Sequence, residues 1–388
     1  MKIKKIAAII LTFCLVLGAS LITVGAEQST SGEASLNFEL DCRSAILMEA
    51  GTGKILYEMN ADESLPPASV TKVITLLLVM EAIESGKISL SDTVTASAHA
   101  CSMGGSQIYL KEGEQMSVED LIKSVVIASA NDAALALAEY VAGTEGAFVE
   151  LMNEKAESLG LTGTHFENTN GLDDTVQNHV SSARDIAIMS RELIKHEKIT
   201  EYSSIWMDTV RNGEFGLTNT NRLVRFYKGA TGLKTGSTAK AKFCITATAE
   251  RDGMSLICVI MAAPTRDVRN AAAVSLLDWG FANYAVYKNA GGQADSLRVL
   301  GGVKNSCAVS YPDFSCVVNK ADISKITFDI ETEEKLAAPV RVGEKVGKVT
   351  YRLGESELGS VDITAIEEID KIGFGGLLLR MLSRMCFC

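Results

Sequence analysis

The sequence lacks the motifs of a metalloprotein and the charge of a nucleic-acid-binding protein. Its 388 residues include only four histidines, and neither an H-E-x-x-H nor a C-x-x-C pattern occurs. No metal site and no cofactor is therefore expected. The formal net charge is −11, whereas nucleic-acid-binding proteins carry basic patches, so nucleic acid is excluded as a partner. No internal repeat and no low-complexity tract stands out in the sequence, so a repeat architecture is not indicated.

The spacing of the nine cysteines does not indicate a particular disulfide pairing. Residues 243–261 are predicted to be a β-hairpin with a two-residue Asp-Gly turn. In that register Cys244 lies opposite Met261 and Cys258 opposite Ala247, so the two cysteines are not cross-strand partners and cannot form a disulfide. We expect both to be small core residues. Two later cysteines, at positions 307 and 316, could pair, although nothing in the sequence requires it.

The first 26 residues are predicted to be a secretory signal peptide rather than part of the fold. Three lysines precede the apolar run Ile6–Val24, and Val24-Gly25-Ala26 supplies the small residues of a cleavage site. An uncleaved anchor is the alternative, but the apolar run is near the lower length limit for a spanning helix. We therefore expect the protein to be secreted across the cytoplasmic membrane.

The remaining chain is predicted to contain a mixed domain (27–290) and a β-rich domain (291–368). An N-terminal hairpin and several amphipathic helices fall in the first domain, and short runs of apolar residues alternating with polar ones fall in the second. The predicted elements are a hairpin of Ser44–Met48 and Lys54–Glu58, and helices over Val70–Ser85, Val118–Ile127, Ala133–Val141, Ser182–His196 and Asp267–Asn283.

The last segment, residues 369–388, is predicted to be an amphipathic helix. Its apolar residues recur at helical spacing, and Arg380 and Arg384 fall on the opposite side. The stripe consists of Phe374, Leu377, Leu378, Met381, Leu382 and Met385. The segment is too short to span a bilayer. We favour a membrane-surface anchor; the alternative is a helix docked on its own domain.

Three short motifs occur in a fixed order: Ser69-Val70-Thr71-Lys72, Ser129-Ala130-Asn131 and Lys234-Thr235-Gly236. Each motif alone is weak evidence for an active site, because the same residues occur at ordinary helix N-termini and in surface turns. Together they supply an activated serine, a proton-handling hydroxyl and amide, and a cationic strand that can hold a carboxylate. The ordered set therefore indicates serine acyl transfer.

The first motif meets the chemical needs of a nucleophile. Ser69 and Lys72 stand at i and i+3, so they share a face of the predicted helix. The hydroxyl lies close to the helix N-terminus, which favours a developing oxyanion. Lys72 can act as a base only when it is neutral, and burial or a second cation such as Lys234 would lower its pKa.

The chain resembles the low-molecular-mass penicillin-binding proteins, the serine-type D-alanyl-D-alanine carboxypeptidases, from about Leu36 to its C-terminus. The resemblance implies an α+β fold: a penicillin-recognising, β-lactamase-like domain with an antiparallel sheet and flanking helices, plus a small all-β domain. It rests on the three motifs and on Pro67–Lys72, Ala128–Ala133, His165-Phe166, Asn170–Asp173, Ser181–Asp185, Thr231–Thr238 and Val342–Gly347.

The resemblance implies a role for each motif residue. Ser69 attacks the penultimate D-Ala of a peptidoglycan stem peptide, Lys72 accepts its proton, and Ser129 relays a proton to the leaving D-Ala. β-Lactam antibiotics would be covalent inhibitors, and the protein would serve cell-wall biogenesis and cell shape. The substrate-binding residues implied are Asn131, Lys234, Thr235, Gly236, Ser237 and, as a weaker carboxylate candidate, Arg269.

One position departs from the family pattern, and two other functions compete. Lys242 stands where many relatives have glycine, and we expect it to alter the outer side of the strand that carries Lys234. A class A β-lactamase shares the serine, lysine and Lys-Thr-Gly elements. It would also need a Glu-x-x-Leu-Asn-type loop, which is absent between Asn131 and Lys234. A non-catalytic wall-binding scaffold is the third possibility, and the intact motifs argue against it.

Overall fold

The structure, a computed structural model, describes residues 36–386. From Glu39 onward these residues cluster in one unit. The predicted signal peptide lies outside the described residues.

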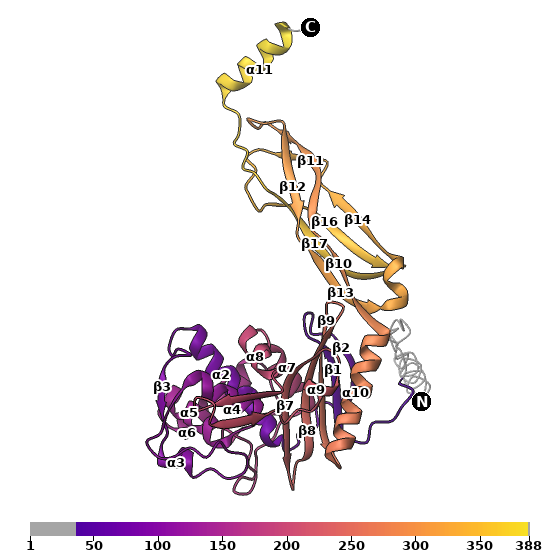
Figure 1. The fold of residues 1–388 in the computed structure, drawn as a ribbon. Helices are drawn as coiled ribbons and strands as arrows, with labels where there is room; N and C mark the ends of the chain where they lie inside the picture. Colours follow the sequence, from indigo (N-terminus) through magenta and orange to yellow (C-terminus); the bar gives the residue numbers. More distant parts are fainter. Residues whose placement is uncertain (1–35, 387–388) are drawn as a thin grey trace, which may run out of the picture. The chain divides into compact units, whose positions relative to one another are not determined.

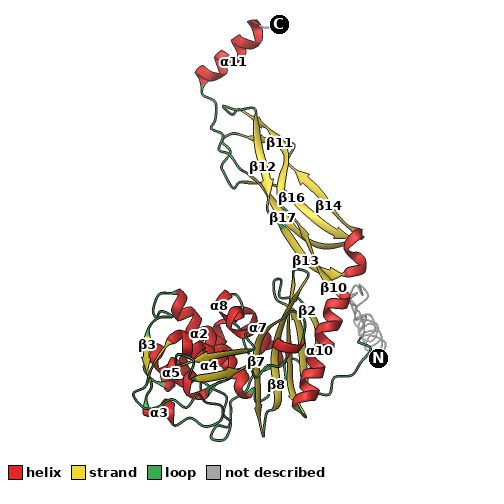
Figure 2. Cartoon of the chain, viewed as in Figure 1, coloured by secondary structure: helices red, strands yellow, loops and turns green. Residues whose placement is uncertain are grey.

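A five-stranded antiparallel sheet is the centre of the N-terminal domain, in the strand order β2-β1-β9-β8-β7 (Figures 1 and 2). Buried side chains, most of them apolar, cover both faces of the middle strands, as expected for a sheet covered on both sides. The strands are β1 (Ser44–Glu49), β2 (Ile55–Met59), β7 (Ala230–Thr238), β8 (Lys242–Arg251) and β9 (Met254–Ala263).

Helices surround this sheet, and five of the described helices begin at a serine or threonine whose side chain accepts a backbone N–H. Two small strand pairs, β3–β4 (Thr93–Thr95, Gln115–Ser117) and β5–β6 (Met207–Val210, Phe215–Thr218), complete the domain. The helices are η1 (Ala68–Thr71), α2 (Lys72–Glu84), α3 (Ala98–Cys101), α4 (Val118–Ile127), α5 (Asn131–Ala142), α6 (Glu145–Ser158), α7 (Ala183–Leu193), α8 (Glu197–Ser203), α9 (Leu223–Phe226) and α10 (Arg266–Asn283).

The alternation of side chains along a strand gives the sheet two packed faces. On one face Val259 joins the main core, and its cross-strand partner Thr246 hydrogen-bonds Ser190 of α7 at 2.8 Å. On the other face Leu256 lies under α10, where a Cβ at Gly280 would come within 2.9 Å of it. Glycine at that position therefore lets α10 pack directly on the sheet.

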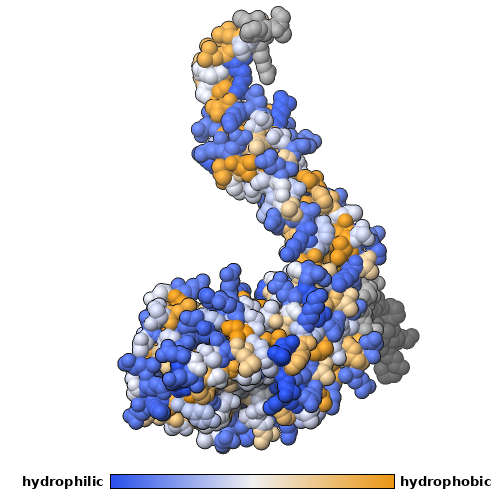
Figure 3. Space-filling model, viewed as in Figure 1, coloured by the Kyte–Doolittle hydropathy of each residue, from blue (hydrophilic) through white to orange (hydrophobic). Residues whose placement is uncertain are grey.

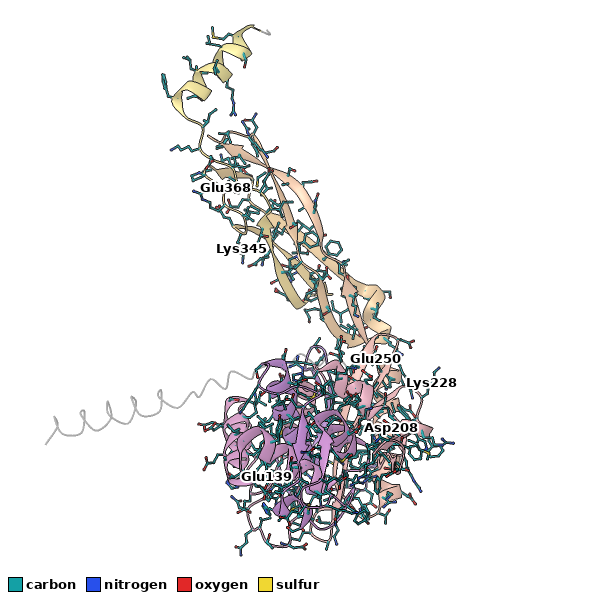
Figure 4. All side chains as sticks on the ribbon, turned by 60° about the vertical axis from the view of Figure 1, so that its left-hand side comes forward. Glu139, Asp208, Lys228, Glu250, Lys345 and Glu368 are labelled. Carbon is teal, nitrogen blue, oxygen red and sulfur yellow. The ribbon has the colours of Figure 1, made fainter. Side chains whose placement is uncertain are left out.

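A second domain follows α10 and consists mainly of strands. A six-stranded sheet has the order β14-β16-β17-β12-β11-β15, and β10 pairs with β13. Lys345, labelled in Figure 4, forms an ion pair at 2.6 Å with Asp362 of the neighbouring strand. The strands are β10 (Tyr284–Asn289), β11 (Gly292–Leu300), β12 (Ser306–Tyr311), β13 (Phe314–Asn319), β14 (Ile326–Thr332), β15 (Lys335–Ala337), β16 (Lys345–Leu353) and β17 (Ser356–Ala365), with a 3-10 turn η2 (Lys320–Lys325).

The N-terminal hairpin and the helices predicted from periodicity are all present. The helix over Val118–Ile127 has the predicted bounds, and the other elements have shifted ends. The helix predicted over Val70–Ser85 begins at Lys72, because Ala68–Thr71 form a tighter 3-10 turn. Lys242 begins β8 with φ +58° and is exposed. Glycine adopts this left-handed conformation at little cost, which accounts physically for glycine at this place in relatives.

The predicted hairpin register is correct for one cysteine and wrong for the other. Cys258 pairs with Ala247, as predicted. A register shift at Cys244 removes it from its expected place opposite Met261, and its Sγ instead accepts the N–H of Ala262 at 3.5 Å. A bulge inserts one unpaired residue, which periodicity alone does not reveal. Six cysteines are free thiols in the structure: Cys42, Cys101, Cys244, Cys258, Cys307 and Cys316.

The C-terminal helix α11 (Phe374–Cys386) carries an exposed apolar face, visible in orange in Figure 3. Phe374 is 83% exposed, Met381 57% and Met385 75%. The guanidinium of Arg380 donates to the carbonyl of Val303 and to the side-chain oxygen of Asn305, both at 2.9 Å. Within residues 36–386, no helix has the length and hydrophobicity needed to cross a bilayer.

Candidate active site

Ser69 lies in the 3-10 turn η1 that leads into α2. The preceding residue, Ala68, has φ +49°, a conformation that non-glycine residues seldom adopt. This turn directs the Ser69 hydroxyl toward Lys72, whose Nζ lies 2.9 Å from Oγ. The distance is that of a direct hydrogen bond, so nucleophile and base are in contact without substrate.

Lys72 is completely buried, and its Nζ has three oxygen neighbours. Besides Ser69, these are Oδ1 of Asn131 at 2.6 Å and the carbonyl of Asn170 at 2.9 Å. Burial holds the pKa of Lys72 well below its ordinary value, and the charge of Lys234 lowers the pKa further. A neutral amine has two N–H donors and one lone pair. With both donors bound by the two asparagines, the lone pair is left to face the Ser69 hydroxyl.

The second and third motifs meet at Lys234. Its Nζ donates to Ser129 Oγ at 2.8 Å and to the carbonyl of Thr235 at 2.9 Å. Burial and then the positive charge of Arg269 lower the pKa of Lys234 to about 7. Ser129 lies between α4 and α5 with φ +63°, a strained conformation that aims its hydroxyl at the lysine. These contacts let a proton pass between Lys234 and Ser129.

Asn131 lies at the start of α5 and uses both ends of its amide. Its Oδ1 accepts from Lys72, and its Nδ2 donates to the carbonyl of Gly104 at 2.6 Å. The resemblance assigns Asn131 to the substrate backbone. In this structure the residue orients Lys72, and its Nδ2 carries a second N–H besides the one bound to Gly104.

Strand β7 packs tightly against the nucleophile turn. A Cβ at Gly236 would lie 2.8 Å from the Ser69 backbone nitrogen and 2.9 Å from the Pro67 carbonyl. These are backbone atoms, so a larger residue would displace the turn itself. Next to this contact, the Thr235 hydroxyl donates to Oγ1 of Thr220 at 2.8 Å. Gly236 is therefore required for the position of Ser69 as well as for space beside the strand.

The cavity in front of these residues has a volume of about 420 Å³. Arg269 lies in its wall and is only 3% exposed. Its guanidinium donates to the Cys244 carbonyl at 3.3 Å and to the Asn270 side chain at 2.8 Å. Burial lowers the pKa of Arg269 to about 10, so it stays charged at neutral pH. The predicted site residues in the wall are Ser69, Ser129, Thr235, Gly236, Ser237 and Arg269.

Comparisons with known proteins agree with this geometry. A family model described as D-alanyl-D-alanine carboxypeptidase matches residues 28–265, and one described as the C-terminal domain of penicillin-binding protein 5 matches residues 286–371. The D-alanyl-D-alanine carboxypeptidase DacF of Bacillus subtilis is 39% identical over 379 residues, which cover 95% of this chain and 97% of DacF. The chain belongs to the D-alanyl-D-alanine carboxypeptidase family.

Solved structures of related proteins confirm the predicted fold class. Penicillin-binding protein 5 from Haemophilus influenzae is 32% identical with a TM-score of 0.76, over 87% of this chain and 100% of that one. Ampicillin-bound penicillin-binding protein D2 from Listeria monocytogenes is 32% identical with a TM-score of 0.59, over 64% of this chain and 100% of that one. Neither the β-lactamase nor the scaffold alternative is favoured by these relatives.

Sequence reasoning missed several residues that support this carboxypeptidase site. The carbonyl of Asn170 holds Lys72, and a Cβ at Gly171 would lie 1.9 Å from the Ala68 carbonyl. Nε2 of His179 lies 2.7 Å from Thr71 Oγ1, and burial lowers the pKa of His179 to about 4, so its ring is neutral. The Asn170–Asp173 segment matched the family pattern, but a backbone carbonyl leaves no side-chain signature by which its role could be read.

The contact at Gly236 generates a prediction. Gly236→Ala should displace the Ser69 turn and lower the second-order rate constant for acylation by a fluorescent penicillin about 100-fold, as misplacement of a nucleophile by about 1 Å would. Gly216→Ala is the matched control, because nothing lies within 4 Å of a Cβ at that position. Equal acylation rates in the two variants would show that β7 does not position the nucleophile.

Proposed function

We propose that this protein removes the terminal D-Ala from peptidoglycan stem peptides through an acyl-enzyme on Ser69. The observation that carries the proposal is the 2.9 Å contact between Ser69 Oγ and Lys72 Nζ, with the other two neighbours of that nitrogen supplied by asparagine oxygens. Lys72 takes the hydroxyl proton as Oγ attacks the carbonyl carbon. Backbone N–H groups of Ser69 and Ser237 stabilise the oxyanion.

The leaving D-Ala departs on the Lys234 side of the cavity. Its amine receives a proton through Ser129, whose Oγ lies 2.8 Å from Lys234 Nζ. Lys234, Thr235 and Arg269 attract the terminal carboxylate, and a bound carboxylate raises the pKa of Lys234 by its charge. Water then attacks the ester and frees Ser69. β-Lactams carry a carboxylate and a reactive amide, so they enter the same path.

The location of the protein completes the proposal. Residues 1–26 direct secretion, and α11 attaches the protein to the outer face of the cytoplasmic membrane. The exposed side chains of Phe374, Met381 and Met385 support this, because a contiguous apolar surface marks a site of protein or membrane contact. Such a helix lies in the interface, with its leucines at the acyl boundary.

The nucleophile assignment predicts where penicillin attaches. After incubation with a β-lactam, mass spectrometry of the digested protein should find the adduct on the peptide that contains Ser69, and Ser69→Ala should prevent it. The adduct should decay slowly, whereas a β-lactamase would turn over rapidly. A modified peptide without Ser69, or the absence of any adduct on an intact protein, would contradict the proposed function.

The anchor assignment predicts a change on truncation. A chain that ends at Ile369 should no longer sediment with anionic vesicles but should release D-Ala at the full-length rate, because all three motifs lie far upstream. A full-length Leu378→Asp variant, altered only on the apolar face, should also stay in the supernatant. High salt should weaken binding only in part, since apolar burial supplies most of the affinity. If the truncated chain still sediments, α11 is not the anchor.

A further inference from the structure

Two arginines without an assigned role line the active-site cavity. Arg222 lies just before α9, Arg266 is the first residue of α10, and both share the cavity wall with Ser69. Both are exposed, and within residues 36–386 neither guanidinium has an acidic partner or a hydrogen-bond acceptor. By contrast, Arg184 and Arg211 each form close ion pairs with acids. The cavity therefore presents two uncompensated cations to whatever enters it.

Both arginines line the same cavity as Thr235 and Arg269. Arg222 lies two residues after Thr220, whose hydroxyl is 2.8 Å from that of Thr235. Arg266 stands three positions before Arg269 on the same helix, so the two lie on one face of it. Thr235 and Arg269 are the groups assigned to the terminal carboxylate. Arg222 and Arg266 thus approach that position from two different segments.

The number of positive charges exceeds what a D-Ala leaving group requires. One carboxylate is already met by Lys234, Thr235 and Arg269. Two further guanidinium groups favour a leaving group with a second negative charge, since an arginine fork matches the geometry of a carboxylate. Trp206 also lines this wall and offers an apolar surface to a short aliphatic side chain.

We propose that Arg222 and Arg266 form a second anion subsite, which selects leaving residues that carry a side-chain carboxylate. This inference rests on the proposed function and extends it to peptides in which D-Ala is joined to an acidic residue. The chemistry is unchanged. The Ser69 ester forms as the C–N bond breaks, the released amine takes the proton delivered by Ser129, and water cleaves the ester.

The test compares three peptides that differ only in the last residue: D-Ala, D-Glu or its neutral isostere D-Gln. The intact protein should cleave the D-Glu peptide with a kcat/KM about tenfold above that of the D-Gln peptide, as expected for two partly exposed charge pairs. The ratio should fall toward one in the Arg222→Gln and Arg266→Gln variants, and it should fall with rising salt.

Arg225→Gln is the matched control. Arg225 is exposed and lies three residues after Arg222. Its guanidinium lies over the rings of Trp206 and Phe226, but Arg225 is not part of the cavity wall. It should keep the D-Glu preference. A wild-type ratio of one or less, an equal loss of the ratio in Arg225→Gln, or an equal loss for all three peptides in Arg222→Gln would overturn the subsite. Failure to cleave any peptide, together with absent penicillin labelling, would overturn the proposed function itself.

Discussion

The burial of Lys72 is the constraint on which the rest of this site depends. A lysine in water is protonated at neutral pH and cannot accept the proton of a serine hydroxyl. Surrounded by protein and placed near Lys234, Lys72 has a pKa held well below its ordinary value. The charged form is the one that burial penalises, so the protein gains a base by excluding water from it. With its two N–H groups bound by the asparagine oxygens, the neutral amine turns its lone pair to the Ser69 hydroxyl.

The fold supplies that burial from segments far apart in the sequence. Helix α2 is apolar nearly all round and carries Lys72 into the core, while α5 brings Asn131 and the loop after α6 brings the carbonyl of Asn170. Strand β7 closes the other side, and glycine at 236 lets it touch the turn that holds Ser69. A displacement of any one of these elements would admit water or move an acceptor, which explains why the surroundings of the site are so closely packed.

The three motifs and most helices could be predicted from the sequence. The motifs are recognised by the identity of their side chains, and the helices by the period of their apolar residues. The resemblance gave Ser129 a role in proton relay, but its 2.8 Å contact with Lys234 depends on a strained serine backbone that the motif does not reveal. The role of the Asn170 carbonyl could not be predicted, since any residue offers a carbonyl and only the tertiary path decides where it points. The same holds for the bulge at Cys244, which depends on strand pairing rather than on residue type.

The most direct test of the account is the pH dependence of acylation. The rate constant for acylation by a fluorescent penicillin should rise with pH and reach half its plateau well below the ordinary lysine value of 10.5, because the base must be deprotonated. Lys72→Arg cannot lose its proton and should lose about 10²–10⁴-fold in rate at every pH, whereas the exposed Lys228→Arg should behave like the parent (Figure 4). Near-normal acylation by Lys72→Arg, or a midpoint at that ordinary lysine value, would contradict the assignment of Lys72 as the neutral base.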